Sequence, residues 1–94
     1  MHNATYTLLV LDDDSALRGA IRHWAGRQGY RVHTAASTDE ARSVVAEKAI
    51  DLALLDIRLP DGDGIELAES LIQADPERPI ILMTAFADLD SARK

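Results

Sequence analysis

Acidic side chains follow two apolar runs in this 94-residue chain. Residues 12–14, all aspartates, come directly after the run 8–11, and Asp56 comes directly after the run 52–55. Two carboxylates about 4 Å apart repel each other by roughly 4 kcal/mol at an effective dielectric of about 20. If the chain brings these acids together, the group will hold either a shared proton or a bound cation.

An all-oxygen site of this kind favours a hard cation, and Mg²⁺ binds through one or two carboxylates together with waters and a phosphate. Mg²⁺ beside a carboxylate indicates phosphoryl chemistry, because the ion offsets the repulsion between an attacking aspartate and an incoming phosphoryl group. The product would be an aspartyl phosphate. Asp56, alone at its strand end, is the best-placed nucleophile, while Asp12 and Asp13 can share the ion. Thr84, which follows a third apolar run, could donate a hydrogen bond to a phosphoryl oxygen.

The elements that must position these residues are strands alternating with amphipathic helices. Apolar runs predict strands at 8–11, 52–55 and 80–83, and a further strand is expected at about 31–35. Helices are expected after Asp14 or Ser15, after the capping box 37–40, and after Asp63. This alternation predicts an α/β fold with a doubly wound parallel sheet and helices on both faces. If the strand order is 2-1-3-4, the first and third strands are neighbours, and their acids meet at the carboxyl edge of the sheet.

Several other residues have structural interpretations. We interpret Asp14 as a helix cap rather than a metal ligand. In the segment LPDGDG, Asp61 and Asp63 are expected to be turn and cap residues, and one of the two glycines is expected to take a positive φ. Trp24, at helical spacing from other apolar residues, is expected in the core.

Composition limits the classes of partner. The net charge of -6 disfavours direct binding to nucleic acid or to an anionic membrane, so any DNA-binding part would lie elsewhere. An apolar fraction of 47% and a charged fraction of 28% indicate a folded domain. The chain has no cysteine, no signal-peptide pattern and no apolar run long enough to span a bilayer. We therefore expect a cytoplasmic protein.

Three segments resemble the receiver domains of two-component response regulators. LLVLDDDSALR resembles the first strand and acidic pair of that family, LALLDIRLPDGDG its phosphoacceptor strand and loop, and PIILMTA its fourth strand with the switch hydroxyl. The stretch MTAFADLD is similar to receivers of the nitrogen-regulation type, which control sigma-54 activators. The resemblance implies a flavodoxin-like (CheY-like) sheet, of which this chain would hold strands in the order 2-1-3-4.

The resemblance also implies roles for individual residues. A histidine kinase would phosphorylate Asp56, while Asp13 and Asp56 would ligate Mg²⁺ directly and Asp12 would act largely through water. The main-chain carbonyl of Arg58 would be the remaining protein ligand of the metal. Thr84 would turn inward on phosphorylation, and the altered charge would shift a conformational equilibrium in the segment that follows. Such a domain catalyses only its own phosphotransfer and dephosphorylation, and is not an enzyme in the usual sense.

The sequence departs from the family at its end. Family members continue into a fifth strand and a fifth helix, which carry a lysine and an aromatic switch residue, whereas this sequence ends at Lys94, which we interpret as a solvated side chain. Residues 1–94 are therefore expected to form a C-terminally incomplete receiver domain. Ile80–Met83 would be an exposed apolar edge, and one face of the sheet would lack a covering helix. We expect either a homodimer through this edge and face, or a fragment of a longer protein with an output or DNA-binding domain.

Two other functions stay open. The first is a phosphorylation-defective receiver fragment that acts as a protein-interaction or dimerisation module. The second is a free-standing Mg²⁺-dependent phosphohydrolase with Asp56 as nucleophile. The hydrolase has the least support, because the sequence supplies neither a substrate pocket nor a clear general acid.

Overall fold

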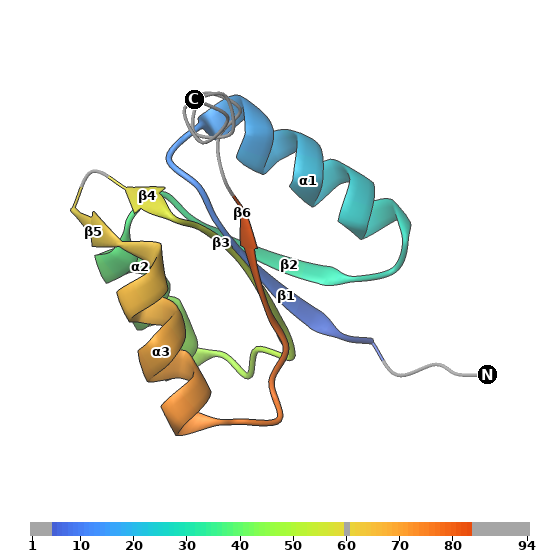
Figure 1. The fold of residues 1–94 in the computed structure, drawn as a ribbon. Coiled ribbons are helices and arrows are strands. Elements are labelled where there is room, and N and C mark those ends of the chain that lie inside the picture. The colour runs from blue at the N-terminus through green and yellow to red at the C-terminus, as the bar shows by residue number, and fades with distance from the viewer. Residues whose placement is uncertain (1–4, 60, 84–94) are drawn as a thin grey trace, which may run out of the picture.

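Strands and helices alternate along the chain, with a small hairpin before the third helix (Figure 1). The computed structural model describes residues 5–59 and 61–83. The main sheet contains β1 (Thr7–Leu11), β2 (Arg31–Ala35), β3 (Leu52–Asp56) and β6 (Ile80–Met83). The helices are α1 (Ser15–Arg27), α2 (Thr38–Glu47) and α3 (Gly64–Ala74), and the hairpin consists of β4 (Arg58–Leu59) and β5 (Gly62–Asp63).

The main sheet is parallel, with the order β2-β1-β3-β6. Because β6 is the fourth strand of this sheet along the chain, the order is the predicted 2-1-3-4, and the predicted flavodoxin-like α/β fold is confirmed. Leu11 pairs with Leu55 where β1 and β3 run side by side. The residues that follow these two positions, Asp12 and Asp56, therefore lie at the same edge of the sheet.

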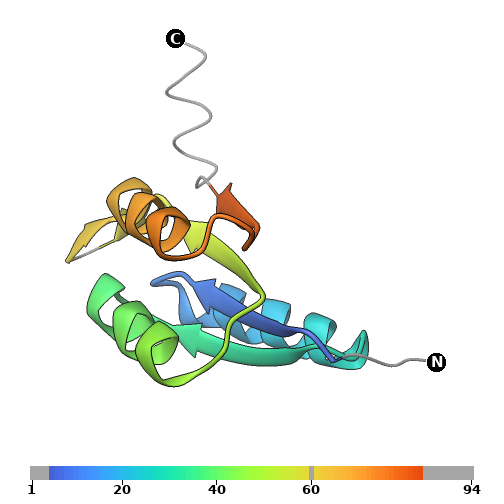
Figure 2. The same cartoon turned by 90° about the horizontal axis from the view of Figure 1, so that it is seen from below.

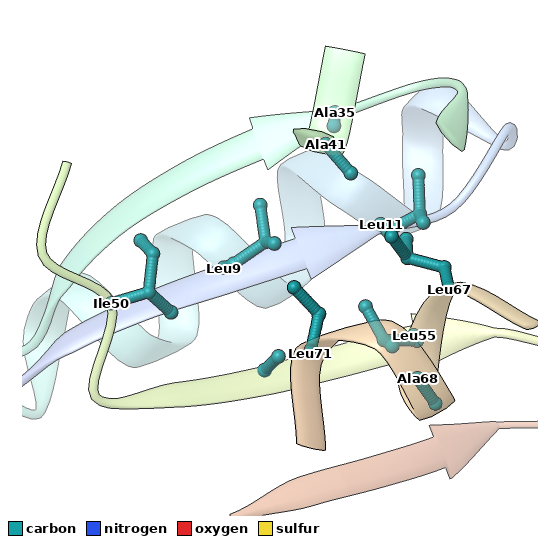
Figure 3. Packing of buried hydrophobic residues seen from close by; sticks show 10 residues of the cluster. Leu9, Leu11, Ala35, Ala41, Ile50, Leu55, Leu67, Ala68 and Leu71 are labelled. Carbon is teal, nitrogen blue, oxygen red and sulfur yellow. The ribbon is translucent and has the colours of Figure 1, made fainter. Parts of the chain in front are cut away.

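The two faces of the sheet carry different helices (Figure 1, Figure 2). Leu9 and Leu11 of β1 belong to the larger core cluster, which includes side chains from α2 and α3, whereas Leu8 and Val10 belong to a second cluster with α1. This separation follows from the alternation of side chains along a strand. Figure 3 shows Leu67 and Leu71 of α3 pointing toward the leucines of β1. Full burial of one such leucine contributes about 1.5–3 kcal/mol.

Two helices begin at the predicted aspartate caps. The side chain of Asp14 accepts hydrogen bonds from the N–H groups of Ala16 at 2.9 Å and Leu17 at 3.2 Å, so it caps α1. The side chain of Asp63 accepts a hydrogen bond from the N–H of Ile65 at 2.8 Å and caps α3. Because its carboxylate is engaged by the helix, Asp14 is not part of the acidic group formed by its neighbours.

The expectation that Gly62 or Gly64 has a positive φ is wrong. Among the described glycines the positive φ belongs to Gly29, at 96°, just after α1. Gly64 is required for a different reason, because a Cβ at this position would overlap the main-chain oxygen of Asp56 and lie 2.8 Å from its carbonyl carbon. The start of α3 therefore lies directly against the end of β3.

The expectation that Trp24 lies in the core is also wrong, since 60% of its surface is exposed. On α1, Ala25 is buried and Ile21 is partly buried against the sheet, whereas Trp24, three residues after Ile21, lies at the exposed border of the same helix face. On β6, Ile81 and Leu82 are 48% and 43% exposed, as expected for a strand at the edge of the described sheet. None of the helices in the described ranges has the length and apolarity to cross a bilayer.

Candidate functional site

Three carboxylates gather at the carboxyl edge of the sheet. Oxygen atoms of Asp12, Asp13 and Asp56 all lie within 4.8 Å of one another. Asp12 and Asp56 are buried, with 5% and 8% of their surface exposed, while Asp13 is exposed to solvent. The pairing of β1 with β3 is the cause, because each strand delivers its terminal acid to the same place. The structure thus brings together the side chains predicted from the sequence.

Asp12 is held from several directions. Its carboxylate accepts a hydrogen bond from the N–H of Asp14 at 2.9 Å, and its own N–H donates to the carbonyl of Ala35 at 3.1 Å. The carbonyl of Asp12 accepts a hydrogen bond from the guanidinium of Arg18 at 2.8 Å. Sequence reasoning did not identify Arg18, because a spacing of six residues across a strand-to-helix turn carries no recognisable signal. These contacts fix the backbone that carries the acidic pair.

Asp56 lies in an environment that disfavours its charge. Burial raises the pKa of the Asp56 carboxyl above its usual 3.8, and the negative charges of Asp12 and Asp13 raise it further. The N–H of Arg58, which donates to the Asp56 carboxylate at 3.3 Å, acts in the opposite direction. A cation bound among the three carboxylates would offset much of the repulsion between their charges. The donor set therefore fits a hard divalent ion such as Mg²⁺, which prefers oxygen ligands and retains several waters.

Of the remaining predicted site residues, Arg58 lies within the described part of the chain and the other two lie outside it. Arg58 lies in β4, two residues beyond Asp56, and its hydrogen bond to that carboxylate places the hairpin backbone at the site. The metal-ligand role of its carbonyl stays a prediction. Thr84 and Lys94 lie outside the described residues, so the switch role of the first and the solvated position of the second also stay predictions.

Asp61 has a tertiary contact that the expectation of a turn residue did not include. Its carboxylate accepts hydrogen bonds from Thr38 and Asp39 at the start of α2. The N–H and hydroxyl of Thr38, followed by the N–H of Asp39, hold the pKa of the Asp61 carboxyl below its usual 3.8. A contact across more than twenty residues has no counterpart in local sequence patterns, which explains why it was not predicted.

A parallel sheet with acidic residues at its carboxyl edge, and helices on both faces, defines an α/β domain of the CheY-like class. The family model of the response regulator receiver domain matches residues 8–94. The chain belongs to this family, whose members are signalling domains of two-component systems. The predicted resemblance to receiver domains is confirmed.

Known relatives and solved structures agree with this assignment. The chain is 36% identical over 84 residues to the response regulator protein PilR of Pseudomonas aeruginosa, and 37% identical over 83 residues to the DNA-binding transcriptional regulator NtrC of Salmonella typhimurium. These matches cover 89% and 88% of the chain, but only 19% and 18% of PilR and NtrC, so the chain spans about a fifth of their length. The response regulator TrrA of Thermotoga maritima, crystallised in complex with Mg²⁺ and BeF, has a TM-score of 0.82 and 30% identity, with 93% of this chain and 76% of TrrA covered.

Proposed function

We propose that this chain is a phosphoacceptor domain, in which Asp56 receives a phosphoryl group from the phosphohistidine of a sensor histidine kinase. The observation that carries the proposal is the gathering of three carboxylate side chains within 4.8 Å at the end of β1 and β3. Membership of the receiver family supplies the class of reaction. Residues 1–94 would act as one receiver unit within two-component signal transduction.

Four residues of the chain would hold the Mg²⁺ ion during the transfer. Asp13 and Asp56 would ligate Mg²⁺ directly, Asp12 would act largely through water, and the carbonyl of Arg58 would complete the protein ligands. When bound, Mg²⁺ would neutralise charge on the phosphoryl oxygens and on the attacking carboxylate. The Mg²⁺ and BeF complex of TrrA supports this choice of ion.

The covalent step needs Asp56 in its ionised form. One carboxylate oxygen of Asp56 forms a bond to phosphorus while the phosphorus–nitrogen bond of the donor breaks, and the electron pair stays on the imidazole nitrogen. Thr84 would then donate a hydrogen bond to a phosphoryl oxygen. The resulting change in charge and hydrogen bonding would shift an equilibrium in residues 84–94.

Incubation with a small-molecule phosphodonor and Mg²⁺, followed by intact-mass measurement, tests the proposal. We expect a phosphoryl adduct that forms with Mg²⁺ and is absent when a chelator replaces it. No adduct under either condition would favour the alternative of an interaction module that has lost phosphorylation. Steady turnover of phosphate esters, with no accumulated adduct, would favour the phosphohydrolase.

The length of the relatives and the exposed residues of β6 support two further proposals, an output domain and a second copy of the chain as partners. PilR and NtrC are much longer than this chain, which supports an output domain in the whole protein. Ile81 and Leu82 on β6 also support pairing with a second copy of the chain, because an exposed apolar edge strand is a template for further strands. Sedimentation of the 94-residue chain should show a dimer. A stable, well-folded monomer at all concentrations would contradict this pairing.

A further inference from the structure

Within the described residues, the carboxylate of Asp61 links the β4–β5 hairpin to the start of α2. Oδ1 of Asp61 accepts a hydrogen bond from the N–H of Thr38 at 3.0 Å. Oδ2 of Asp61 accepts one from the hydroxyl of Thr38 at 2.8 Å and one from the N–H of Asp39 at 3.2 Å. Asp61 lies between β4 and β5 in the chain and is 23 residues from Thr38. One side chain therefore joins two segments that the sequence keeps far apart.

Asp61 completes the hydrogen bonding of the α2 N-terminus, where the first N–H groups lack partners inside the helix. The local cap Ser37 binds the N–H groups that follow. Its hydroxyl accepts a hydrogen bond from the N–H of Glu40 at 3.2 Å, and its carbonyl accepts one from the N–H of Ala41 at 3.0 Å. The N–H groups of Thr38 and Asp39 bond to Asp61 instead. The same helix terminus thus has a local cap and a remote one.

The other end of the hairpin is fixed against the acidic group. The N–H of Gly64 donates to the carbonyl of Ile57 at 2.8 Å, and Gly64 packs directly on the backbone of Asp56. The N–H of Arg58 donates to the carboxylate of Asp56. At the α2 end, a Cβ on Gly62 would lie 3.2 Å from the Thr38 hydroxyl, so the hairpin is in close contact there as well. Movement of the hairpin relative to α2 would therefore change the backbone around Asp56.

We infer that Asp61 is a positioning residue for the metal site, because its bonds to α2 hold the hairpin that carries Arg58 and orients Asp56. The inference rests on the proposed function, since it concerns binding of Mg²⁺ by this acidic group. Asp61 is not among the carboxylates that gather at the site, and its effect passes through the hairpin backbone. Groups that orient metal ligands from outside typically change metal affinity by about 10- to 100-fold when they are removed.

Mg²⁺ titrations of the 94-residue chain, followed by amide chemical shifts, test the inference through two variants that remove caps from the same helix terminus. Asp61→Ala removes the remote cap and the link to the hairpin, whereas Ser37→Ala removes the local cap and leaves the link intact. We expect the Kd for Mg²⁺ to rise about tenfold in Asp61→Ala. In Ser37→Ala the Kd should stay close to that of the parent chain, although the helix terminus is weakened.

Equal Kd values in the parent and in Asp61→Ala would overturn the inference and leave the proposed function intact. An equal rise in Asp61→Ala and Ser37→Ala would also overturn it, because weakening of α2 would then be the cause. A parent chain that binds no Mg²⁺ would overturn both the proposed function and the inference. If Asp61→Ala does not fold, Thr38→Val can replace it, because this variant removes one hydrogen bond to Asp61 at nearly constant volume. The Kd of Thr38→Val for Mg²⁺ should rise by a smaller factor than about tenfold. An unchanged Kd would overturn the inference.

Discussion

Gly64→Ala is expected to destabilise the chain by about 3 kcal/mol, because overpacking against rigid surroundings costs about 1–3 kcal/mol and occasionally more. The added methyl group would overlap the main-chain oxygen of Asp56 and lie 2.9 Å from Cα of Ile57. Both neighbours are backbone atoms, in the last residue of the interior strand β3 and in the residue that follows it, so neither can move aside as a flexible side chain could. Urea denaturation followed by far-UV circular dichroism measures the effect.

Gly19→Ala is the matched control for this substitution. A Cβ at Gly19, inside α1, would meet no atom within 4 Å. Alanine is favoured over glycine in a helix interior by about 0.5–1 kcal/mol, so this variant should be more stable than the parent chain. If Gly64→Ala were as stable as the parent, the close contact between the start of α3 and the end of β3 would be wrong.

Asp56→Asn is expected to abolish the phosphoryl adduct and, at the same time, to stabilise the metal-free chain. The variant removes the nucleophile, and it also removes one of three charges that repel one another across less than 5 Å. With the exposed Asp13 partly screened by solvent, the gain in the free energy of unfolding should be on the order of 1 kcal/mol near neutral pH. Denaturation without Mg²⁺ measures it, and a loss of stability would contradict the electrostatic account.

The difference in the free energy of unfolding between Asp56→Asn and the parent chain should depend on pH, because the pKa of Asp56 is raised in the folded chain. A carboxyl whose pKa is higher in the folded chain than its unfolded value of 3.8 lowers stability at pH values above the folded pKa. As the pH falls through the folded pKa toward the unfolded value, the parent chain binds a proton on folding and regains this stability. The extra stability of Asp56→Asn over the parent chain should therefore become smaller as the pH falls. Saturating Mg²⁺ at neutral pH should narrow it as well, because the parent binds the ion more tightly.

The main sheet could be predicted because its signals are local. β1, β6 and the first four residues of β3 are apolar or nearly so, and the switch from strand period to helix period marks where α1, α2 and α3 begin. The β4–β5 hairpin could not be predicted, since its strands have two residues each and form only through their mutual pairing. Trp24 has helical spacing but is exposed, because spacing shows that residues share a helix face without showing how wide a stripe the sheet buries.

The acidic group was predictable because its members follow apolar runs, and parallel strands deliver their carboxyl ends to one edge. The sequence could identify the acids as partners only after a strand order was assumed, and the pairing of β1 with β3 supplies that order. The contacts of Arg18 with Asp12 and of Asp61 with Thr38 were missed for a common reason. Both depend on the path of the backbone between elements, which residue spacing does not specify.

The central claim is that the carboxylate of Asp56 itself takes the phosphoryl group. Reduction with borohydride converts an aspartyl phosphate into homoserine, and peptide mass spectrometry then identifies the modified position. After treatment with a phosphodonor and Mg²⁺, we expect homoserine at position 56 and unmodified aspartate at positions 12, 13 and 14. Homoserine at another position, or none at position 56 although an adduct was present before reduction, would contradict the account.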